Sequence, residues 1–313
     1  MTVSEAIESF LVHCRYEKNL SPRTLSAYET DLRQFESALA PEAAADVSQV
    51  DRSHLRPYIQ HLFGPYSEKT VKRKVATLKA FFGYLERDET IAVTPFRKLE
   101  VRIKETKRLP RTIPLAEVER LLRYLYSQQS AGPPRSDVQA FVLVRDTAVL
   151  ETLFATGARV SEICHLGLED VDLDDGWVRI LGKGGKERVV QLCDPAIIAA
   201  LGAYRASRKA VVPSEAYFFL NRHGRRLSEQ SVRGLLQRHA SRAGVAVPVR
   251  PHLIRHSVAT LLLEEGVDIR HIQHLLGHSS IATTQIYTHV NARNQREVLA
   301  TKHPRRRLRV VTA

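Results

Sequence analysis

The chain has 313 residues, of which 43% are hydrophobic, and its formal net charge is +13. This length predicts two domains with ordinary cores, and no apolar run approaches the ~18 residues that a membrane helix requires. The lack of such an apolar run argues against a membrane protein. Three widely scattered cysteines, Cys14, Cys164 and Cys193, are typical of a reducing compartment and indicate neither a disulfide framework nor a zinc cluster. We therefore expect a cytoplasmic protein.

The positive charge is unevenly distributed along the chain. Residues 1–93 hold 12 Lys and Arg against 13 Asp and Glu, whereas residues 94–313 hold 35 against 21. A basic C-terminal two-thirds indicates a polyanionic partner, most simply nucleic acid. The alternative is that the charge serves only solubility.

Residues 1–93 are expected to form an all-helical domain. Apolar residues recur at helical spacing from Ile7 to Cys14, and Ser21 followed by Pro22 is typical of the start of a second helix. Third and fourth helices are predicted over 51–63 and 67–87. The polar face of the fourth helix carries four cations that indicate either a DNA contact or a solvated surface: Lys69, Lys72, Arg73 and Lys79.

Residues 94–114 are predicted to be an interdomain linker. They contain three prolines and seven basic residues against two acidic ones. Such a segment can lie along a phosphate backbone. The candidate DNA-contacting residues here are Arg102, Lys104, Lys107 and Arg108.

Residues 115–302 are expected to form a second, mixed domain, followed by a basic tail over 303–313. The sequence "WVRILGKGGKERVVQL" predicts two short strands around a glycine-rich turn, and "AYFFL" a short strand or a buried extended segment. Helices are predicted over 115–127, 137–156, 195–210, 228–243, 251–265, 268–276 and 279–289. The fold class predicted for the whole chain is mainly helical with a small β-sheet.

Arg159 and Lys183 are polar residues whose positions need a reason. Arg159 follows a glycine turn and begins a helix, where a cation opposes the helix dipole unless an anion is bound. Lys183 lies at the tip of the predicted hairpin, but the spacing of a nucleoside triphosphate loop is absent. A lysine at this tip can reach a ligand as a proton donor, or the glycines can be ordinary turn residues.

His252 and Arg255 lie one helical turn apart, and their types suit two groups that converge on one phosphate. We expect Leu253, Ala259 and Leu261 to form the packed side of this helix.

The stretch "LGHSSIATTQIYTHV" holds His278 and, nine residues later, Tyr287 among polar neighbours. His271, His274 and His278 are not expected to bind metal, because Gly277 ends the helix before His278 and no carboxylate or cysteine lies nearby.

Five motifs in order carry a resemblance to a known family: "ARVSEI", "GKGGKER", "HLIRH", "LGHSS" and "IYTHV". They resemble those of the tyrosine recombinases, which include the phage-type integrases and the Xer recombinases. The resemblance spans nearly the whole chain, and the N-terminal domain is similar to the family's helical, SAM-like core-binding domain. It implies a catalytic domain of the tyrosine-recombinase fold after the linker.

The resemblance also implies a mechanism. Tyr287 would attack the scissile phosphorus and form a 3′-phosphotyrosyl bond, so that no ATP or other cofactor is needed. Arg159 and Arg255 would hold the non-bridging oxygens, and Lys183 would protonate the leaving 5′-oxygen. His252 would assist in proton transfer and His278 would add a hydrogen bond. These side-chain cations would make a divalent metal dispensable.

The resemblance finally implies how the protein acts in the cell. The expected partner is a double-stranded recombination site, on which four copies exchange strands, alone or with a related recombinase. The expected place is the nucleoid of a bacterial cytoplasm. Dimer resolution, transposon resolution and integration of a mobile element all stay open. The rivals are a topoisomerase of the same chemistry and a non-catalytic DNA-binding regulator.

Overall fold

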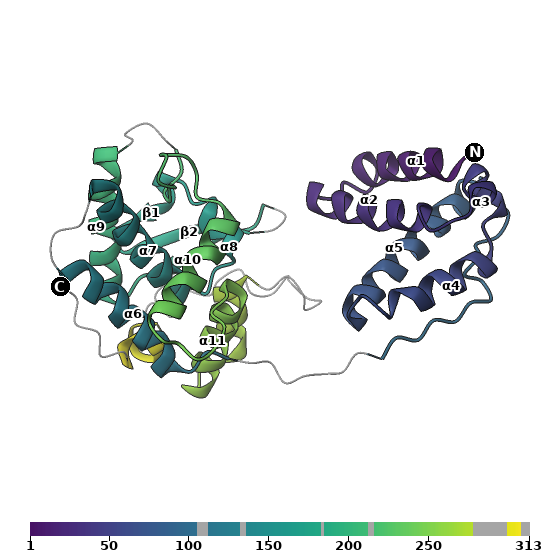
Figure 1. Cartoon of the computed structure of the whole chain (residues 1–313). Helices are drawn as coiled ribbons and strands as arrows, with labels where there is room; N and C mark the ends of the chain where they lie inside the picture. The colour runs from purple at the N-terminus through teal and green to yellow at the C-terminus, as the bar shows by residue number, and fades with distance from the viewer. Residues whose placement is uncertain (105–111, 132–135, 183–184, 212–215, 278–298, 308–313) are drawn as a thin grey trace. The chain divides into compact units, whose positions relative to one another are not determined.

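The computed structural model describes residues 1–104, 112–131, 136–182, 185–211, 216–277 and 299–307. The chain divides into two compact units, Met1–Leu109 and Pro110–Ala313, which Figure 1 shows in purple to blue and in teal to yellow. Each unit is described by itself. The predicted fold class, mainly helical with a small sheet, is confirmed. Within the described ranges, no helix is both long and apolar enough to cross a bilayer.

The first unit is a set of helices around an aromatic core. Phe10, Phe35, Phe81 and Phe82 are at most 3% exposed, and their rings meet in edge-to-face pairs. Side chains of Thr2, Ser21, Asp51 and Ser67 cap the longer helices. The helices are α1 (Val3–Tyr16), α2 (Pro22–Glu36), α3 (Pro41–Ala45), α4 (Arg52–Leu62) and α5 (Glu68–Arg87).

A buried polar cluster joins α2 to α5 inside this unit. Asp31 is 1% exposed and accepts hydrogen bonds from Lys74 Nζ at 2.9 Å and Thr77 Oγ1 at 3.2 Å. Arg73 donates to the same carboxylate from the surface. A buried carboxylate is tolerated only when it is paired in this way, so Asp31 fixes how α5 lies against α2.

The linker is shorter at both ends than the predicted range of residues 94–114. Phe96 and Leu99 pack against the core of the first unit, and Ile113 is 1% exposed in the core of the second. The Ile113 amide also donates to Ser257 Oγ at 2.6 Å. These apolar residues alternate with the cations that dominate the composition of 94–114, and their burial draws both ends of the segment onto the two cores.

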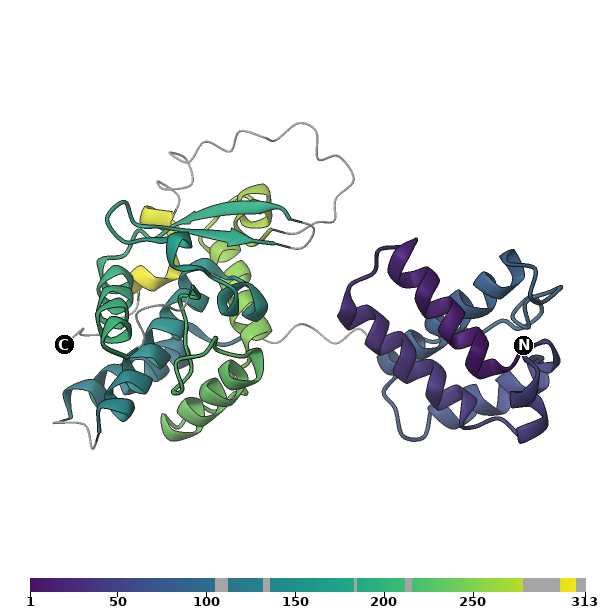
Figure 2. The ribbon, with the colours of Figure 1, turned by 90° about the horizontal axis from the view of Figure 1, so that it is seen from above.

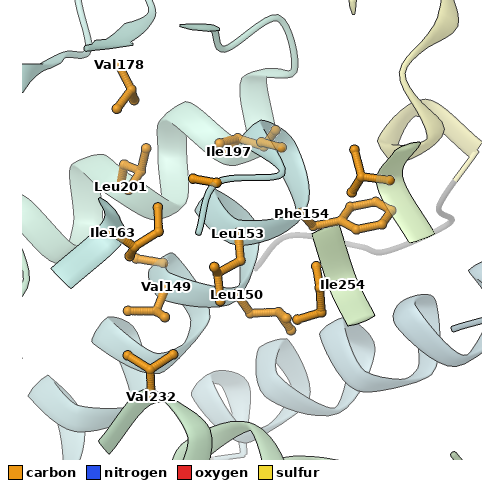
Figure 3. Close-up of a cluster of buried hydrophobic side chains, with 14 of the residues drawn as sticks. Val149, Leu150, Leu153, Phe154, Ile163, Val178, Ile197, Leu201, Val232 and Ile254 are labelled. Carbon is orange, nitrogen blue, oxygen red and sulfur yellow. The ribbon is translucent and has the colours of Figure 1, made fainter. Parts of the chain in front are cut away.

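In the second unit, α7 (Asp137–Thr156) is the central helix, and its second half is buried on every side. Figure 3 shows Leu150, Leu153 and Phe154 of α7 among side chains from the elements that pack around it. Those elements include α6 (Leu115–Ser130), α8 (Val160–Cys164), α9 (Pro195–Val211), α10 (Glu229–Arg242) and α11 (Pro251–Glu264). The last helix described in full is α12 (Ile269–Leu276).

The sheet has three antiparallel strands in the order β1 (Val171–Asp172), β2 (Trp177–Leu181), β3 (Glu187–Gln191). Figure 2 shows β2 and β3 as the long hairpin of this unit. The two predicted strands are confirmed, and β1 was not predicted because two residues are too short for a periodic pattern. In the segment "AYFFL", Phe218, Phe219 and Leu220 are buried, and single bridges join Tyr217 to Gly167 and Leu220 to Arg226.

The residues predicted to pack on α11 do pack against the core, but a neighbouring face is buried more deeply. Leu253, Ala259 and Leu261 are only partly buried, while Ile254, Arg255, Val258 and Leu262 are buried. These four residues follow the helical repeat and form the inner face together. The sequence placed Arg255 on the polar side because a charged residue is rarely buried without partners.

The predicted basic tail, 303–313, begins inside the core of its own unit. Residues 299–302 are helical, and Leu299, His303 and Arg305 are at most 7% exposed. Arg305 forms an ion pair with the buried Glu151 of α7 at 2.8 Å, and Tyr126 donates to the same carboxylate at 2.8 Å. This pairing compensates the burial of both charges and ties residues 299–307 to α7.

Candidate active site

Arg159 is placed by a sharp turn between α7 and α8. Gly157 ends α7 in the left-handed conformation with φ +58°, and Arg159 is the N-cap of α8, as the sequence predicted. A Cβ atom on Gly157 would lie 2.5 Å from Leu276 Cδ2, so α7 closely approaches the end of α12 here, and the positive φ favours glycine. The turn therefore brings Arg159 next to α12.

Glu162 holds two arginines on opposite sides. Its carboxylate accepts from Arg159 NH1 at 2.7 Å and from Arg188 NH2 at 2.7 Å, and also from the Arg159 amide at 2.9 Å. Burial alone would raise the pKa of Glu162, but the hydrogen bonds and charges of Arg188 and Arg159 outweigh burial and hold the pKa below its ordinary value. Glu162 is thus a fixed negative charge.

Arg255 is buried where α7, α11 and α12 meet. It is 9% exposed and donates to the Gly157 carbonyl at 2.9 Å and the Leu276 carbonyl at 2.6 Å. Burial first, and then the positive charges of Arg159 and Arg188, lower the pKa of Arg255 to about 10, although Glu162 opposes the change. The lowered pKa of Arg255 therefore reflects desolvation first and the neighbouring guanidinium groups second.

Three arginines cap the last three carbonyl groups at the end of α12. Arg188 Nε donates to the Leu275 carbonyl at 2.8 Å, Arg255 to Leu276 at 2.6 Å, and Arg159 NH2 to Gly277 at 3.3 Å. Cations at the C-terminal end of a helix also interact favourably with the helix dipole. The next residue in the chain is His278, so the segment that carries His278 and Tyr287 starts at these arginines.

The structure brings together two of the six predicted catalytic residues, Arg159 and Arg255. His252 lies in the first turn of α11 with its side chain exposed, whereas Arg255 of the same helix is buried. Lys183, His278 and Tyr287 lie outside the described residues. The hairpin is described on both sides of Lys183, where the Gly182 amide donates to the Lys186 carbonyl at 2.7 Å.

Glu162 and Arg188 belong to this site but were not selected from the sequence. Both stand inside quoted motifs, "ARVSEI" and "GKGGKER". Glu162 could have been recognised because a glutamate three residues after an N-cap often accepts the N-cap amide. The sequence carries no comparable signal for Arg188, because its position on the inward side of β3, the side of Val190, is known only once the strand register is known.

Nothing in the described ranges is arranged as a metal site: no group of three or more His, Cys, Asp or Glu side chains lies close enough to hold an ion.

Helix α12 ends at Gly277 with φ +64°, as predicted. Burial, then His271 and Arg188, lower the pKa of His274. The surroundings of α12 therefore disfavour additional positive charge.

The predicted DNA-contacting residues of the first unit are on its surface, and Arg73 and Lys79 make contacts within the protein. Lys69 and Lys72 are exposed. Arg73 pairs with Asp31 while its side chain stays 48% exposed, and Lys79 lies over the Phe96 ring at 5.7 Å.

Two of the four predicted linker contacts, Arg102 and Lys104, are exposed. Arg102 pairs with Glu100 at 2.6 Å. Lys107 and Arg108 lie outside the described residues.

The chain matches two family profiles and several characterised relatives. The profile described as "Phage integrase family" matches residues 100–294, and that of the phage integrase N-terminal SAM-like domain matches residues 7–89. A protein named tyrosine recombinase from Agathobacter rectalis is 41% identical over 300 residues, 96% of each chain. A tyrosine recombinase XerC from Pelobacter propionicus is 36% identical over 305 residues, 97% of this chain and 96% of the relative.

A solved structure shares the fold. It is a lambda integrase tetramer bound to a Holliday junction, with a TM-score of 0.68 and 16% identity, over 90% of this chain and 76% of that one. The profile matches, the near-complete coverage of the relatives and the paired arginines agree with the resemblance that the motifs indicated. The chain therefore belongs to the phage integrase family, the tyrosine-type site-specific DNA recombinases.

Proposed function

We propose that this recombinase cuts DNA through Tyr287 and rejoins it to a second duplex without a cofactor. The observation that carries the proposal is the convergence of Arg159 and Arg255 on the end of α12, directly before the segment that bears Tyr287. Arg159 and Arg188 bond to the single carboxylate of Glu162, and Arg255 is influenced by its charge, so three cations share one carboxylate and two positive charges are left to be balanced by an anion.

A phosphodiester supplies the missing negative charge. The pKa of Arg255, lowered to about 10, would return toward its ordinary value when a phosphate oxygen lies beside it. Negative charge grows on the non-bridging oxygens as a nucleophile attacks phosphorus, so preorganised guanidinium groups stabilise the transition state more than the ground state. The side chain of Arg159 is 38% exposed and can meet such a phosphate from the surface.

The remaining roles follow the motif order. The Tyr287 hydroxyl attacks phosphorus and loses its proton, and the bond from phosphorus to the 5′-oxygen breaks. Lys183 protonates the leaving 5′-oxygen, His252 assists this proton transfer, and His278 donates a hydrogen bond to the phosphate. The 3′-phosphotyrosyl bond conserves the energy of the phosphodiester, so the reverse attack by a 5′-hydroxyl reseals the strand.

The DNA surface proposed for the chain includes both basic regions outside the active site. In the first unit these are Lys69, Lys72, Arg73 and Lys79, and after α5 they are Arg102, Lys104, Lys107 and Arg108. Arg73 is held by the buried Asp31, so its guanidinium is oriented before DNA arrives and less side-chain entropy is lost on binding.

Four copies are proposed to act on two paired sites, as in the tetramer on a Holliday junction described above, alone or with a related recombinase. The proposed place is the nucleoid in the bacterial cytoplasm. This one reaction can serve three roles: resolution of chromosome or plasmid dimers, resolution of transposons, and integration of a mobile element.

A suicide substrate tests the proposal. Nicked duplexes that cover the DNA flanking the native gene, in which the released fragment with the free 5′-hydroxyl diffuses away, should trap a protein–DNA adduct that survives denaturation. Tyr287→Phe keeps the ring but removes the hydroxyl, so DNA binding should persist and the adduct should disappear. An adduct that persists in Tyr287→Phe would assign the nucleophile to another residue.

Cleavage is also expected to proceed in excess EDTA, because guanidinium and ammonium groups supply the positive charge that a divalent ion supplies in other phosphoryl transfers. Loss of adduct in EDTA with recovery in magnesium or manganese would instead indicate a metal-dependent nuclease.

A further inference from the structure

We infer that Arg188 is a positioning residue that joins the three segments carrying the proposed catalytic groups. It lies on β3, five residues after Lys183, and contacts α8, which begins at Arg159, and α12, which ends just before His278. This inference rests on the proposed function, because the segments matter to catalysis only if their residues have the roles given above.

All three nitrogen atoms of the Arg188 guanidinium group bond to the protein. Nε donates to the Leu275 carbonyl at 2.8 Å, NH2 to Glu162 Oε2 at 2.7 Å, and NH1 to Glu162 Oε1 at 3.3 Å. A Cβ atom at Gly277 would lie 2.9 Å from NH1, so the chain leaving α12 passes directly against this group. A rigid planar fork can fix two partners at once, which a single ammonium group cannot do.

The backbone of Arg188 fixes the other side of this connection. Arg188 pairs with Ile180 across the β2–β3 ladder, close to the turn that carries Lys183. Its side chain points inward, like that of Val190. A shift of the hairpin would therefore move the guanidinium group, and with it the contacts to Glu162 and Leu275.

Stability alone does not account for an arginine at this place. An apolar side chain of similar size at an inward strand position avoids the desolvation of a charge and is often neutral or stabilising. Direct contact with DNA does not account for it either. The Arg188 side chain is 6% exposed and faces protein acceptors, whereas that of Arg159 is 38% exposed. Arg188 thus acts through Glu162, Arg159 and the end of α12.

Arg145 provides a matched control. Its side chain is 7% exposed, and like Arg188 it bonds to one carboxylate and one carbonyl: Asp146 at 2.6 Å and Leu220 at 3.3 Å. Arg145 lies on α7 and bonds to neither α8 nor α12 in these contacts. Replacement of either arginine by methionine removes the same chemistry from the interior of the unit.

The experiment compares Arg188→Met with Arg145→Met on the nicked duplex that carries the mapped cleavage site. The single-turnover rate of adduct formation is measured at saturating DNA, and the Kd for DNA is measured in the Tyr287→Phe background. Arg188→Met should slow the rate by ~100-fold, the effect of a displacement of about 1 Å in a reacting group, and should change the Kd by less than about 3-fold. Arg145→Met should leave the rate within about 3-fold of the wild type.

Arg188→Lys keeps the charge beside Glu162 and should recover part of the lost rate. If the methionine variants do not fold, Arg188→Lys and Arg145→Lys are compared by the same two measurements. Equal rates for the Arg188 and Arg145 variants at saturating DNA would overturn the inference, as would a wild-type rate in Arg188→Met accompanied by a weaker Kd. A wild-type protein that forms no adduct would overturn the proposed function itself, and the inference with it.

Discussion

Glu162 shows how much a single buried charge can determine in this site. Its carboxylate separates two arginines that would otherwise repel each other, and it accepts the amide that begins α8. Removing one partner of a buried pair typically costs about 3–5 kcal/mol, because the other charge stays buried without compensation. The placement of both arginines therefore depends on this one side chain.

Glu162→Gln should destabilise the second unit in a pH-dependent way. The pKa of Glu162 is lowered in the folded state, so its contribution is complete above its unfolded pKa of about 4.3 and is lost as the pH falls through the folded pKa. The wild type should exceed the variant by roughly 3 kcal/mol in free energy of unfolding at pH 7, and by less below about pH 4. Urea denaturation at several pH values measures this, and a difference that is constant with pH would contradict it.

Asp31 allows the same reasoning to be tested away from the active site. Asp31→Ala leaves Lys74, 2% exposed, without its carboxylate partner and should lower the unfolding free energy of the first unit by about 3–5 kcal/mol. The double variant Asp31→Leu with Lys74→Met replaces both charges by apolar groups and should recover most of this loss. Thermal unfolding compares the two, and a double variant no more stable than Asp31→Ala would refute the argument.

The motifs allowed catalytic residues to be proposed, but not the side chains that hold them. Arg159 was selected as a cation at a helix start and Arg255 for its spacing of one turn from His252, and the structure places both at the end of α12. Arg188 was passed over because the sequence does not reveal which side of a short strand faces the interior until the register is known. The inward position of Arg188 follows from its pairing with Ile180.

At the level of elements, the close approach of α7 to α12 is what assembles the site. Gly157 is necessary for two reasons: its φ is +58°, and the space of a Cβ atom is taken by Leu276, at 2.5 Å. Gly244 also has a positive φ, +66°, but a Cβ atom there would meet nothing within 4 Å. A comparison of substitutions at Gly157 and Gly244 therefore separates the effect of backbone strain from that of crowding.

Gly157→Ala should therefore destabilise the second unit more than Gly244→Ala. Both substitutions carry the strain of a left-handed residue, about 1–2 kcal/mol, and Gly157→Ala adds about 1–3 kcal/mol because the buried Leu276 side chain must shift. The melting temperatures of the two variants measure the difference. Equal melting temperatures would mean that α7 and α12 are not tightly packed in solution.

Element types and most boundaries could be predicted from the sequence because capping residues and long apolar stripes are local features. Ser21, Ser67 and Gly277 end or begin helices where expected. The face of α11 could not be predicted, since Arg255 is buried through carbonyl groups supplied by two other helices. Strand β1 was missed because it depends on its pairing with β2 rather than on its own residues.

At the scale of the whole molecule, the basic charge and the two-unit organisation together determine how DNA is held. The excess of cations lies after residue 93, beyond a nearly neutral helical unit. Each cation that neutralises a phosphate releases condensed counterions, so the salt dependence of binding counts such contacts.

Replacing Lys104, Lys107 and Arg108 by alanine should reduce the slope of log affinity against log salt by ~3 if each cation contacts one phosphate. Titrations of one duplex at several salt concentrations measure the slope for the wild type and the variant. An unchanged slope would mean that this segment does not contact the backbone.

The pairing of Glu151 with Arg305 has a consequence for synthesis on the ribosome. The two residues are 154 positions apart, so at about 5–20 residues per second the growing chain carries an unpaired Glu151 for roughly 8–30 s. The helical unit, complete by residue 109, can fold during that interval, whereas the interior of the second unit closes only after Arg305 has been added. The helical unit can thus complete its fold before the unit that holds Arg159 and Arg255 has closed.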